Sequence, residues 1–234
     1  MGTAAIQSSP NVFQRLASFR QRFGVKETIL KSLDAVLNKA LRTHVHRVVW
    51  LDLTAVAHVV PADDVFTFRT LNADEVAKFA EDPSYFIDPS LIEGVRSGRE
   101  VCFAALACDR LAAFGCYTLG YVEPRQAAGA AISFPSDVAY MSYGFTHPDF
   151  RGFRLHGIAM ALALQELAKR GITKLVSIVS WTNVASLKSC ERLGYISLGN
   201  MITIGTPNHA LGFYPEAAKQ LGVRFGRKAV KSKV

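Results

Sequence analysis

Two arginines and a glycine stand where a strand-like run gives way to a helix-like one. Residues 147–154 read His-Pro-Asp-Phe-Arg-Gly-Phe-Arg, and a helical pattern begins at Leu155. A helix start exposes backbone N–H donors and the positive end of the helix dipole, and glycine lets that backbone approach a ligand closely. Arg151 and Arg154 add fixed positive charge at the same point. The segment therefore predicts a site for a pyrophosphate group, although the same arginines would also suit an ordinary surface turn.

Regularly spaced landmarks follow this turn. The helical segment ends at Lys169-Arg170-Gly171, a strand-like run comes next, and Asn183 opens a second helix that closes with Glu191-Arg-Leu-Gly-Tyr195. The series resembles the acyl-CoA-binding core of the GNAT superfamily of N-acyltransferases. That family's signature is an Arg/Gln-x-x-Gly-x-Gly/Ala turn after the fourth strand, then an Asn-led helix ending in Leu-Gly-Phe/Tyr. The resemblance covers about residues 63–205, and its second half is the specific part.

The turn departs from the family signature at its glycines. With Arg151 as the leading arginine, Arg154 and His156 replace the two signature glycines. A rival register, Arg154-Leu-His-Gly157-Ile-Ala159, fits the letters of the motif but shortens the helix and shifts every later landmark. We therefore prefer Arg151 as the leading residue. Residues 154 and 156 are then expected to adopt helical dihedrals without the freedom of glycine. His156 is expected to pack in the helix or to line a pocket rather than to act as a base.

The resemblance implies a mixed α/β fold with a splayed central sheet. It also implies transfer of an acetyl or related acyl group to an amine by direct attack, with acetyl-CoA or another acyl-CoA as co-substrate and no metal. Backbone N–H groups between the fourth and fifth strands would polarise the thioester carbonyl. The positions that the resemblance places at the cofactor are Phe145, Thr146, Arg151, Gly152, Phe153, Arg154, Leu155, His156, Asn183 and Ser186. The acceptor is expected to be a small-molecule amine, which the sequence does not identify.

Two further positions are the candidates for catalysis. The resemblance puts Tyr140 where some relatives keep a glutamate base. A tyrosine with a pKa near 10 is a poor base at neutral pH, so it is expected to orient an acceptor or a water. Cys190 stands where many relatives keep a tyrosine that protonates the leaving thiolate. A thiol with a pKa of about 8.5 could serve as that acid, or Cys190 could simply fill a small buried space. Strand alternation puts Tyr140, Ser142 and Gly144 on one face, with a bulge expected at Gly144.

Hydrophobic spacing predicts the elements that must position these residues. Helices are predicted over residues 12–23, 29–41, 73–80, 89–96, 155–170 and 184–193. Strands are predicted over residues 48–54, 65–70, 100–107, 111–117, 138–146, 174–179 and 196–204, and residues 121–136 read as a loop. The resulting order of strands and helices is typical of a mixed α/β domain.

Positive charge is concentrated at the two ends of the chain. The net charge is +8 over 234 residues. Residues 11–48 carry eight Lys or Arg against two acids, and residues 215–234 carry six against one. We therefore predict a basic helical N-terminal extension over 1–60, a GNAT acyltransferase domain over 61–214 and a basic C-terminal tail over 215–234.

These basic arms suggest partners beyond the amine. An acidic carrier protein or an anionic membrane surface would suit them. Nucleic acid is disfavoured because the arms lack the interleaved aromatic residues that stack bases. Two alternatives to acetyl transfer stay open. One is a longer-chain N-acyltransferase that uses an acyl carrier protein at a membrane surface, and the other is a non-catalytic GNAT-fold binding module.

Cysteine usage and hydropathy indicate the cellular compartment in which the protein is expected. The four cysteines form no C-x-x-C pair and lie near no cluster of histidines, which argues against zinc and against a disulfide framework. No segment reaches the roughly 20 apolar residues that span a bilayer, and the N-terminus does not resemble a secretory signal. A cytoplasmic location is predicted, with a peripheral position at the membrane as an alternative.

Overall fold

One large sheet and one small sheet carry the described part of the chain. The computed structural model describes residues 12–53, 65–124, 126–206 and 211–226. The strands of the large sheet are β1 (Thr43–Asp52), β2 (Thr67–Leu71), β3 (Glu100–Ala107), β4 (Arg110–Leu119), β7 (Val138–Thr146), β8 (Lys174–Ser180), β9 (Ile196–Ile204) and β10 (Leu211–Phe213). The small sheet consists of β5 (Tyr121–Val122), β6 (Ala131–Ser133) and β11 (Arg224–Gly226).

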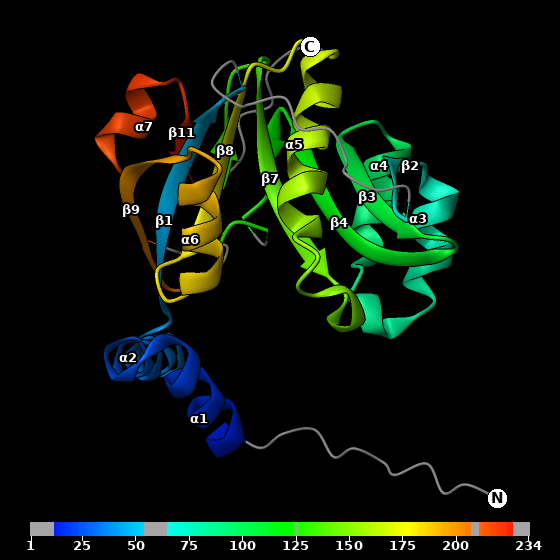
Figure 1. Ribbon diagram of the computed structural model, residues 1–234. Coiled ribbons are helices and arrows are strands. Elements are labelled where there is room, and N and C mark those ends of the chain that lie inside the picture. Colours follow the sequence, from blue (N-terminus) through cyan, green and yellow to red (C-terminus); the bar gives the residue numbers. More distant parts are fainter. Residues whose placement is uncertain (1–11, 54–64, 125, 207–210, 227–234) are drawn as a thin grey trace, which may run out of the picture.

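The helices lie on both faces and at one end of the large sheet (Figure 1). They are α1 (Val12–Phe23), α2 (Val25–Leu41), α3 (Ala73–Ala80), α4 (Pro89–Arg96), α5 (Leu155–Ala168), α6 (Val184–Arg192) and α7 (Glu216–Gln220). The strand order is β10-β9-β1-β8-β7-β4-β3-β2 in the large sheet and β11-β6-β5 in the small one. The pair β7–β8 is parallel, whereas the other neighbours are antiparallel. The mixed α/β fold predicted from the sequence is confirmed.

Alternation along the strands divides the core between the two faces of the sheet. In β1, Val49 and Leu51 pack in the cluster under α5 and α6, whereas Val48 and Trp50 pack in the cluster under the small sheet and α7. A third cluster lies beneath α3 and α4. Because successive strand residues point to opposite faces, both faces of the sheet are buried by a covering layer.

Residues 43–52, which the sequence prediction assigned to the N-terminal extension, are a central strand. β1 pairs with β8 on one side and with β9 on the other. Its predicted range, 48–54, began five residues too late because the polar run Thr-His-Val-His-Arg hides an alternating strand. The predicted domain boundary at residue 60 lies outside the described residues.

Part of the C-terminal segment, which the sequence analysis predicted to be a basic tail, belongs to the folded domain. α7 buries Ala218, and Val223 is buried just before β11, which pairs with β6. Residues 216–226, predicted as part of a basic tail, are therefore packed against the domain, and residues 227–234 lie outside the description. The predicted loop over 121–136 contains β5 and β6.

Local signals explain why the shorter helices were predictable. Asn72 caps α3: its side chain accepts a hydrogen bond from the Glu75 N–H at 2.9 Å, and the Glu75 carboxylate accepts one from the Asn72 N–H at 2.9 Å. This capping box satisfies two backbone donors that the helix leaves free. α4 begins with Pro89 after Asp88, whose carboxylate accepts from the Ser90 N–H at 2.8 Å. Nowhere in the described ranges is a helix long and apolar enough to cross a membrane.

Candidate functional site

The parallel strands β7 and β8 part halfway along their length. They are paired only from Val138–Lys174 to Tyr140–Val176. Just beyond, the Ser177 hydroxyl donates to the Met141 carbonyl at 2.9 Å, and from there the strands diverge. A groove of about 770 Å³ opens at this splay, between the two strands and helices α5 and α6.

A bulge in β7 sits at the same place. Cys116 of β4 lies opposite Tyr143, and Tyr117 lies opposite Met141, so Ser142 has no partner in the register. The Ser142 hydroxyl donates to the Cys116 carbonyl at 3.2 Å. The bulge was predicted at Gly144, but the extra residue is Ser142. An extra residue reverses the alternation of the strand.

The reversal corrects the predicted faces of β7. Tyr143 packs its ring 5.4 Å from Phe114, in the layer of α3 and α4. Gly144 instead faces α5, because a Cβ built on it would lie 2.7 Å from Cε1 of His156. The predicted grouping of Tyr140, Ser142 and Gly144 on one face was therefore wrong.

Gly144 and His156 form a matched pair. His156 replaces a signature glycine at the start of α5, and its ring occupies the space that the missing side chain of Gly144 leaves. Burial lowers the pKa of His156, so the ring is neutral at pH 7. The ring therefore both packs on β7 and lines the groove, which are the two placements predicted for it.

The turn before α5 carries backbone strain at an arginine. Gly152 has φ 99°, which glycine tolerates. Arg154 is the N-cap of α5 with φ 57° and ψ 19°, in the left-handed region. The helical dihedrals expected at residue 154 were wrong, because the chain must reverse there before the helix begins. A left-handed residue with a side chain costs about 1–2 kcal/mol. Arg154 therefore stays in a conformation that the family's glycine would adopt freely.

Most of the predicted cofactor residues surround this groove. The lining includes Phe145, Thr146, Arg151, Gly152, Arg154, Leu155, His156, Asn183 and Ser186. Phe153 does not line it: its side chain is 58% exposed and its ring meets Phe66 at 5.8 Å. Asn183 also caps α6, where its side chain accepts from the Ser186 N–H at 3.2 Å. Both readings of Asn183, cap and groove residue, thus hold together.

Tyr140 lies away from the groove. Its side chain is only 2% exposed and packs with Trp50 and Ile132 under the small sheet. Burial raises the pKa of Tyr140 above its ordinary value. The ring therefore faces the opposite side of the sheet and is not among the described residues that line the groove.

Cys190 and Tyr195 both line the groove. Burial raises the pKa of the Cys190 thiol to about 11, and the Tyr195 N–H donates to the Cys190 carbonyl at 3.0 Å. The Tyr195 hydroxyl is buried, and no described residue offers it a hydrogen bond. Burial also raises the pKa of Tyr195. An unpaired buried hydroxyl is unfavourable, so this group points to a partner that binds in the groove.

The groove is strongly cationic. Its described lining contains four arginines, Arg22, Arg151, Arg154 and Arg192, and no Asp or Glu. Sequence reasoning missed Arg192, although it lies within the Glu191–Tyr195 landmark, and Arg22, which lies about 130 residues before the turn. Four guanidinium groups without a carboxylate suit a polyanionic ligand.

Asp34 fixes the helix pair that carries Arg22. Its carboxylate accepts a hydrogen bond from Trp181 Nε1 at 2.6 Å and from the Thr182 hydroxyl at 3.4 Å. Trp181 and Thr182 directly precede Asn183, so α2 packs on the loop that opens α6. The N-terminal helices are therefore tied to the rim of the groove.

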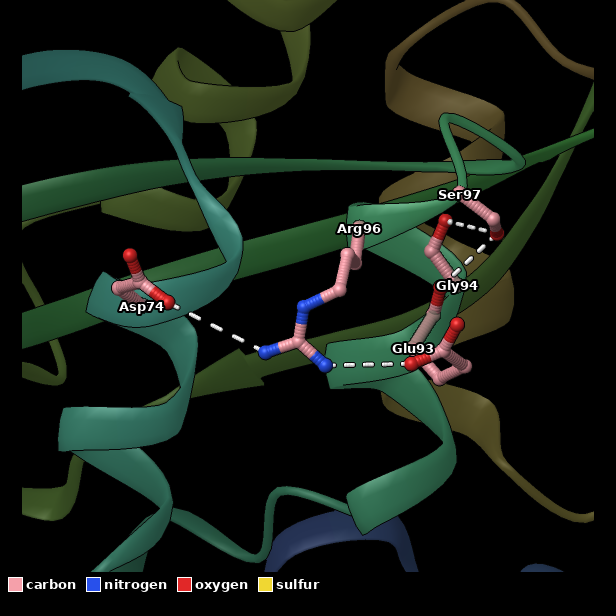
Figure 2. A network of polar contacts seen from close by, with 5 residues as sticks. All are labelled: Asp74, Glu93, Gly94, Arg96 and Ser97. Atoms are coloured by element: carbon pink, nitrogen blue, oxygen red, sulfur yellow. Dashed lines mark hydrogen bonds and ion pairs between the residues drawn. The ribbon is translucent and has the colours of Figure 1, made fainter.

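A second cavity, of about 750 Å³, lies beside α3 and α4. Figure 2 shows part of its wall, where Arg96 reaches Glu93 at 3.1 Å and Asp74 at 4.0 Å. Arg69 is likewise paired with Glu75 at 2.6 Å. Because these guanidinium groups already have carboxylate partners, this cavity is less suited to phosphates than the groove. Within the described ranges, no three His, Cys, Asp or Glu side chains cluster as a metal site would need.

Comparison with known proteins identifies a family. The sequence model of the acetyltransferase (GNAT) family matches residues 65–195. A comparison with curated protein sequences gives no significant match. Among solved structures, a GNAT-family protein from Novosphingobium aromaticivorans superposes with a TM-score of 0.50 at 15% identity, covering 70% of this chain and 64% of that one. A Drosophila protein superposes with a TM-score of 0.50 at 18% identity, covering 82% of this chain and 59% of that one. This chain thus spans about three fifths of the length of each of these proteins. At such low sequence identities, the similarity shows a shared fold.

Proposed function

The chain belongs to the acetyltransferase (GNAT) family, and from that premise we propose that it transfers an acetyl or related acyl group from a CoA thioester to the amine of a small molecule. The observation that carries the proposal is the groove at the splay of β7 and β8, whose described lining has four arginines and no carboxylate. The family relation gives the class of chemistry, and this groove has the charge that an acyl-CoA requires.

The residues present fit a CoA-type ligand. Arg151 and Arg154 flank Gly152 immediately before α5, where backbone N–H groups and the helix dipole favour phosphates. Asn183 and Ser186 stand at the start of α6 on the other side of the groove. Apolar side chains, among them Met141, Leu155 and Met160, line other parts of the groove. A ligand with a phosphate end and an apolar arm would match this lining.

The ligand supplies an acyl carbon activated as a thioester, and the amine attacks that carbon directly. Past the pairing with β8, the register leaves the edge of β7 from Ser142 to Thr146 without a partner strand on that side, and these residues line the groove. Fixed N–H donors at that edge would stabilise negative charge on the carbonyl oxygen. Cys190 and Tyr195 have raised pKa values and are protonated at neutral pH. Because both residues line the groove, either could offer a hydrogen bond to the departing sulfur.

Thermal shift and calorimetry with acetyl-CoA, CoA and a long-chain acyl-CoA test this function. A ligand that binds only the folded state stabilises it by about 2.7 kcal/mol at 100 times its Kd. We expect acetyl-CoA to raise the unfolding midpoint of the wild type, and Arg151→Ala to lose most of that rise. Arg96→Ala, which removes an arginine from the second cavity, is the matched control and should keep it.

The same measurements separate the alternatives. No stabilisation by any thioester, or an equal loss in Arg96→Ala, would contradict the proposed function. Preference for the long chain would favour a longer-chain N-acyltransferase supplied by a carrier protein. Binding without turnover over a broad set of amines would favour a binding module. The absence of a disulfide framework in the sequence supports a reducing compartment, and we place the proposed reaction in the cytoplasm.

A further inference from the structure

Helix α2 presents an apolar stripe to the outside. Its outer stripe consists of Val25, Ile29, Leu33 and Val36, whose side chains are 46–62% exposed. None of the residues of α2 is buried. At 3.6 residues per turn, these four side chains fall within one narrow sector of the helix. Exposed aliphatic residues scattered singly need no explanation, whereas four aligned along one helix indicate an interaction surface.

The charges around the outer stripe are of one sign. By the same helical geometry, Lys26 lies at one edge of the stripe and Lys39 at the other. Across the described side chains between residues 16 and 42, the exposed charged groups are all basic. Those residues are Arg20, Arg22, Lys26, Lys31, Lys39 and Arg42. The acids of this segment, Glu27 and Asp34, are half-buried. The surface therefore combines an apolar centre with a cationic border.

From this combination we propose that α2 docks on an anionic lipid surface. An amphipathic helix with aliphatic residues on one face and lysines at its edges lies in the membrane interface, with the apolar face in the acyl boundary and the cations at the headgroups. The lysines at both edges of the stripe can then contact headgroups while the aliphatic side chains enter the bilayer. The stripe itself is convex and shallow, a shape that a fluid surface can cover.

A second copy of the chain fits this surface less well. Two such faces brought together would oppose lysines to lysines without a carboxylate between them, and like charges across an interface are repulsive. Four side chains also fall short of the roughly 800 Å² per partner that a stable interface buries. The charge complement of the outer stripe is an anionic surface, and a lipid bilayer supplies both the charge and the apolar depth.

Because α2 is attached to the rest of the molecule, docking through α2 would also position the groove. In Figure 1, α1 and α2 lie together at one end of the sheet, beyond β1 and α6. Asp34 ties α2 to Trp181, on the side of the helix away from the outer stripe, and Arg22 lines the groove. Docking through the outer stripe would thus hold the groove close to the lipid surface. The docking itself does not depend on the proposed transferase function.

Sedimentation of the full chain with vesicles tests the proposal. The vesicles are phosphatidylcholine alone or phosphatidylcholine mixed with phosphatidylglycerol. We expect binding to the anionic vesicles, weakened by added salt, and much less binding to the neutral ones. The double variant Ile29→Ser and Leu33→Ser should bind at least about tenfold more weakly, since two aliphatic side chains no longer leave water. Ile196→Ser, at a 57% exposed isoleucine of β9, should bind like the wild type.

The lysines are tested separately. Replacing Lys26 and Lys39 by Gln should weaken binding to anionic vesicles by about fivefold per lysine, whereas Lys78→Gln on α3 should have no effect. Unchanged unfolding midpoints would show that the variants are folded, as expected for exposed positions. Equal binding by the wild type and the Ile29/Leu33 variant would overturn the proposal, because other basic segments would then be responsible. Wild-type binding to an acidic acyl carrier protein but to neither vesicle would overturn it in favour of a protein partner.

Discussion

Replacing Tyr195 by Phe isolates one atom of the groove. The substitution keeps the ring that packs in the main core and removes only the hydroxyl, which is buried and has no hydrogen-bond partner among the described residues. A buried unsatisfied polar group costs about 1–3 kcal/mol. We therefore expect Tyr195→Phe to be more stable than the wild type when no ligand is bound. For a domain of this size the unfolding midpoint should rise by about 2–12 °C.

The same variant should bind and use a thioester less well. If the hydroxyl serves a ligand in the groove, Tyr195→Phe gains stability in the free protein and loses a hydrogen bond in the complex. A net loss of about two- to tenfold in the affinity for acetyl-CoA is expected for one such bond. Opposite signs in the two measurements are the signature of a group retained for function rather than stability.

Thr118→Val is the matched contrast. It too removes one buried hydroxyl, but this one donates to the buried Glu100 carboxylate at 2.8 Å. Burial raises the pKa of Glu100, and loss of its partner should lower the midpoint. Differential scanning fluorimetry with and without acetyl-CoA measures both variants. A midpoint of Tyr195→Phe equal to or below that of the wild type would contradict this prediction, because the hydroxyl would then be satisfied in the free protein.

Further predictions concern the fit, the charge and the pH dependence of the molecule. Gly144→Ala should lower the free energy of unfolding by about 1–3 kcal/mol through overpacking. The double variant Gly144→Ala and His156→Ala should recover most of that loss when measured by urea titration. If the effects of the two single substitutions simply add, the pairing of these residues is contradicted. Arg22→Ala should weaken acetyl-CoA binding in calorimetry by about fivefold, whereas Arg20→Ala in the same turn of α1 should not; equal effects would mean that Arg22 does not serve the groove. Burial, aided by a neighbouring histidine, lowers the pKa of His46 to about 4 from 6.5, so the unfolded chain binds more protons between these values. The contribution of neutral His46 to the free energy of unfolding should therefore be fully present above pH 6.5 and decline by up to about 3 kcal/mol as the pH falls to 4. In urea titrations across this range, the free energy of unfolding of His46→Gln should depend less on pH.

Much of the fold could be predicted from local signals in the sequence. The ranges of α3 and α4 were predicted to the residue, because Asn72 and Asp88 cap them through contacts within three positions. The family relation predicted from the spacing between Arg151 and Tyr195 is confirmed by the family model, which matches residues 65–195. Such features depend on residues that are near in sequence, so one chain suffices to reveal them.

Features set by long-range register escaped the prediction. The bulge at Ser142 exists only through the pairing of β7 with β4, and it decided which side chains face α5. Arg22 reaches the groove because Asp34 bonds to Trp181, 147 positions away. The predicted cofactor positions at the turn and at the two helix starts line the groove, whereas Tyr140 packs under the small sheet. Strand alternation is reliable only until a bulge intervenes.

The place of β1 in the sheet governs the order in which the molecule can be built. Its neighbours, β8 and β9, emerge from the ribosome more than 100 residues later, so at typical synthesis rates β1 waits about 6–30 s for its partners. During that interval the apolar residues of β1 lack their partner strands, namely Val48, Val49, Trp50 and Leu51. Unpaired apolar strands can associate with other chains. The strand register from Thr43–Ile204 to Trp50–Ile196 closes a very long loop, and such pairings form slowly. Nascent-chain chaperones that bind short apolar segments would find their site here, and yield in expression should depend on them.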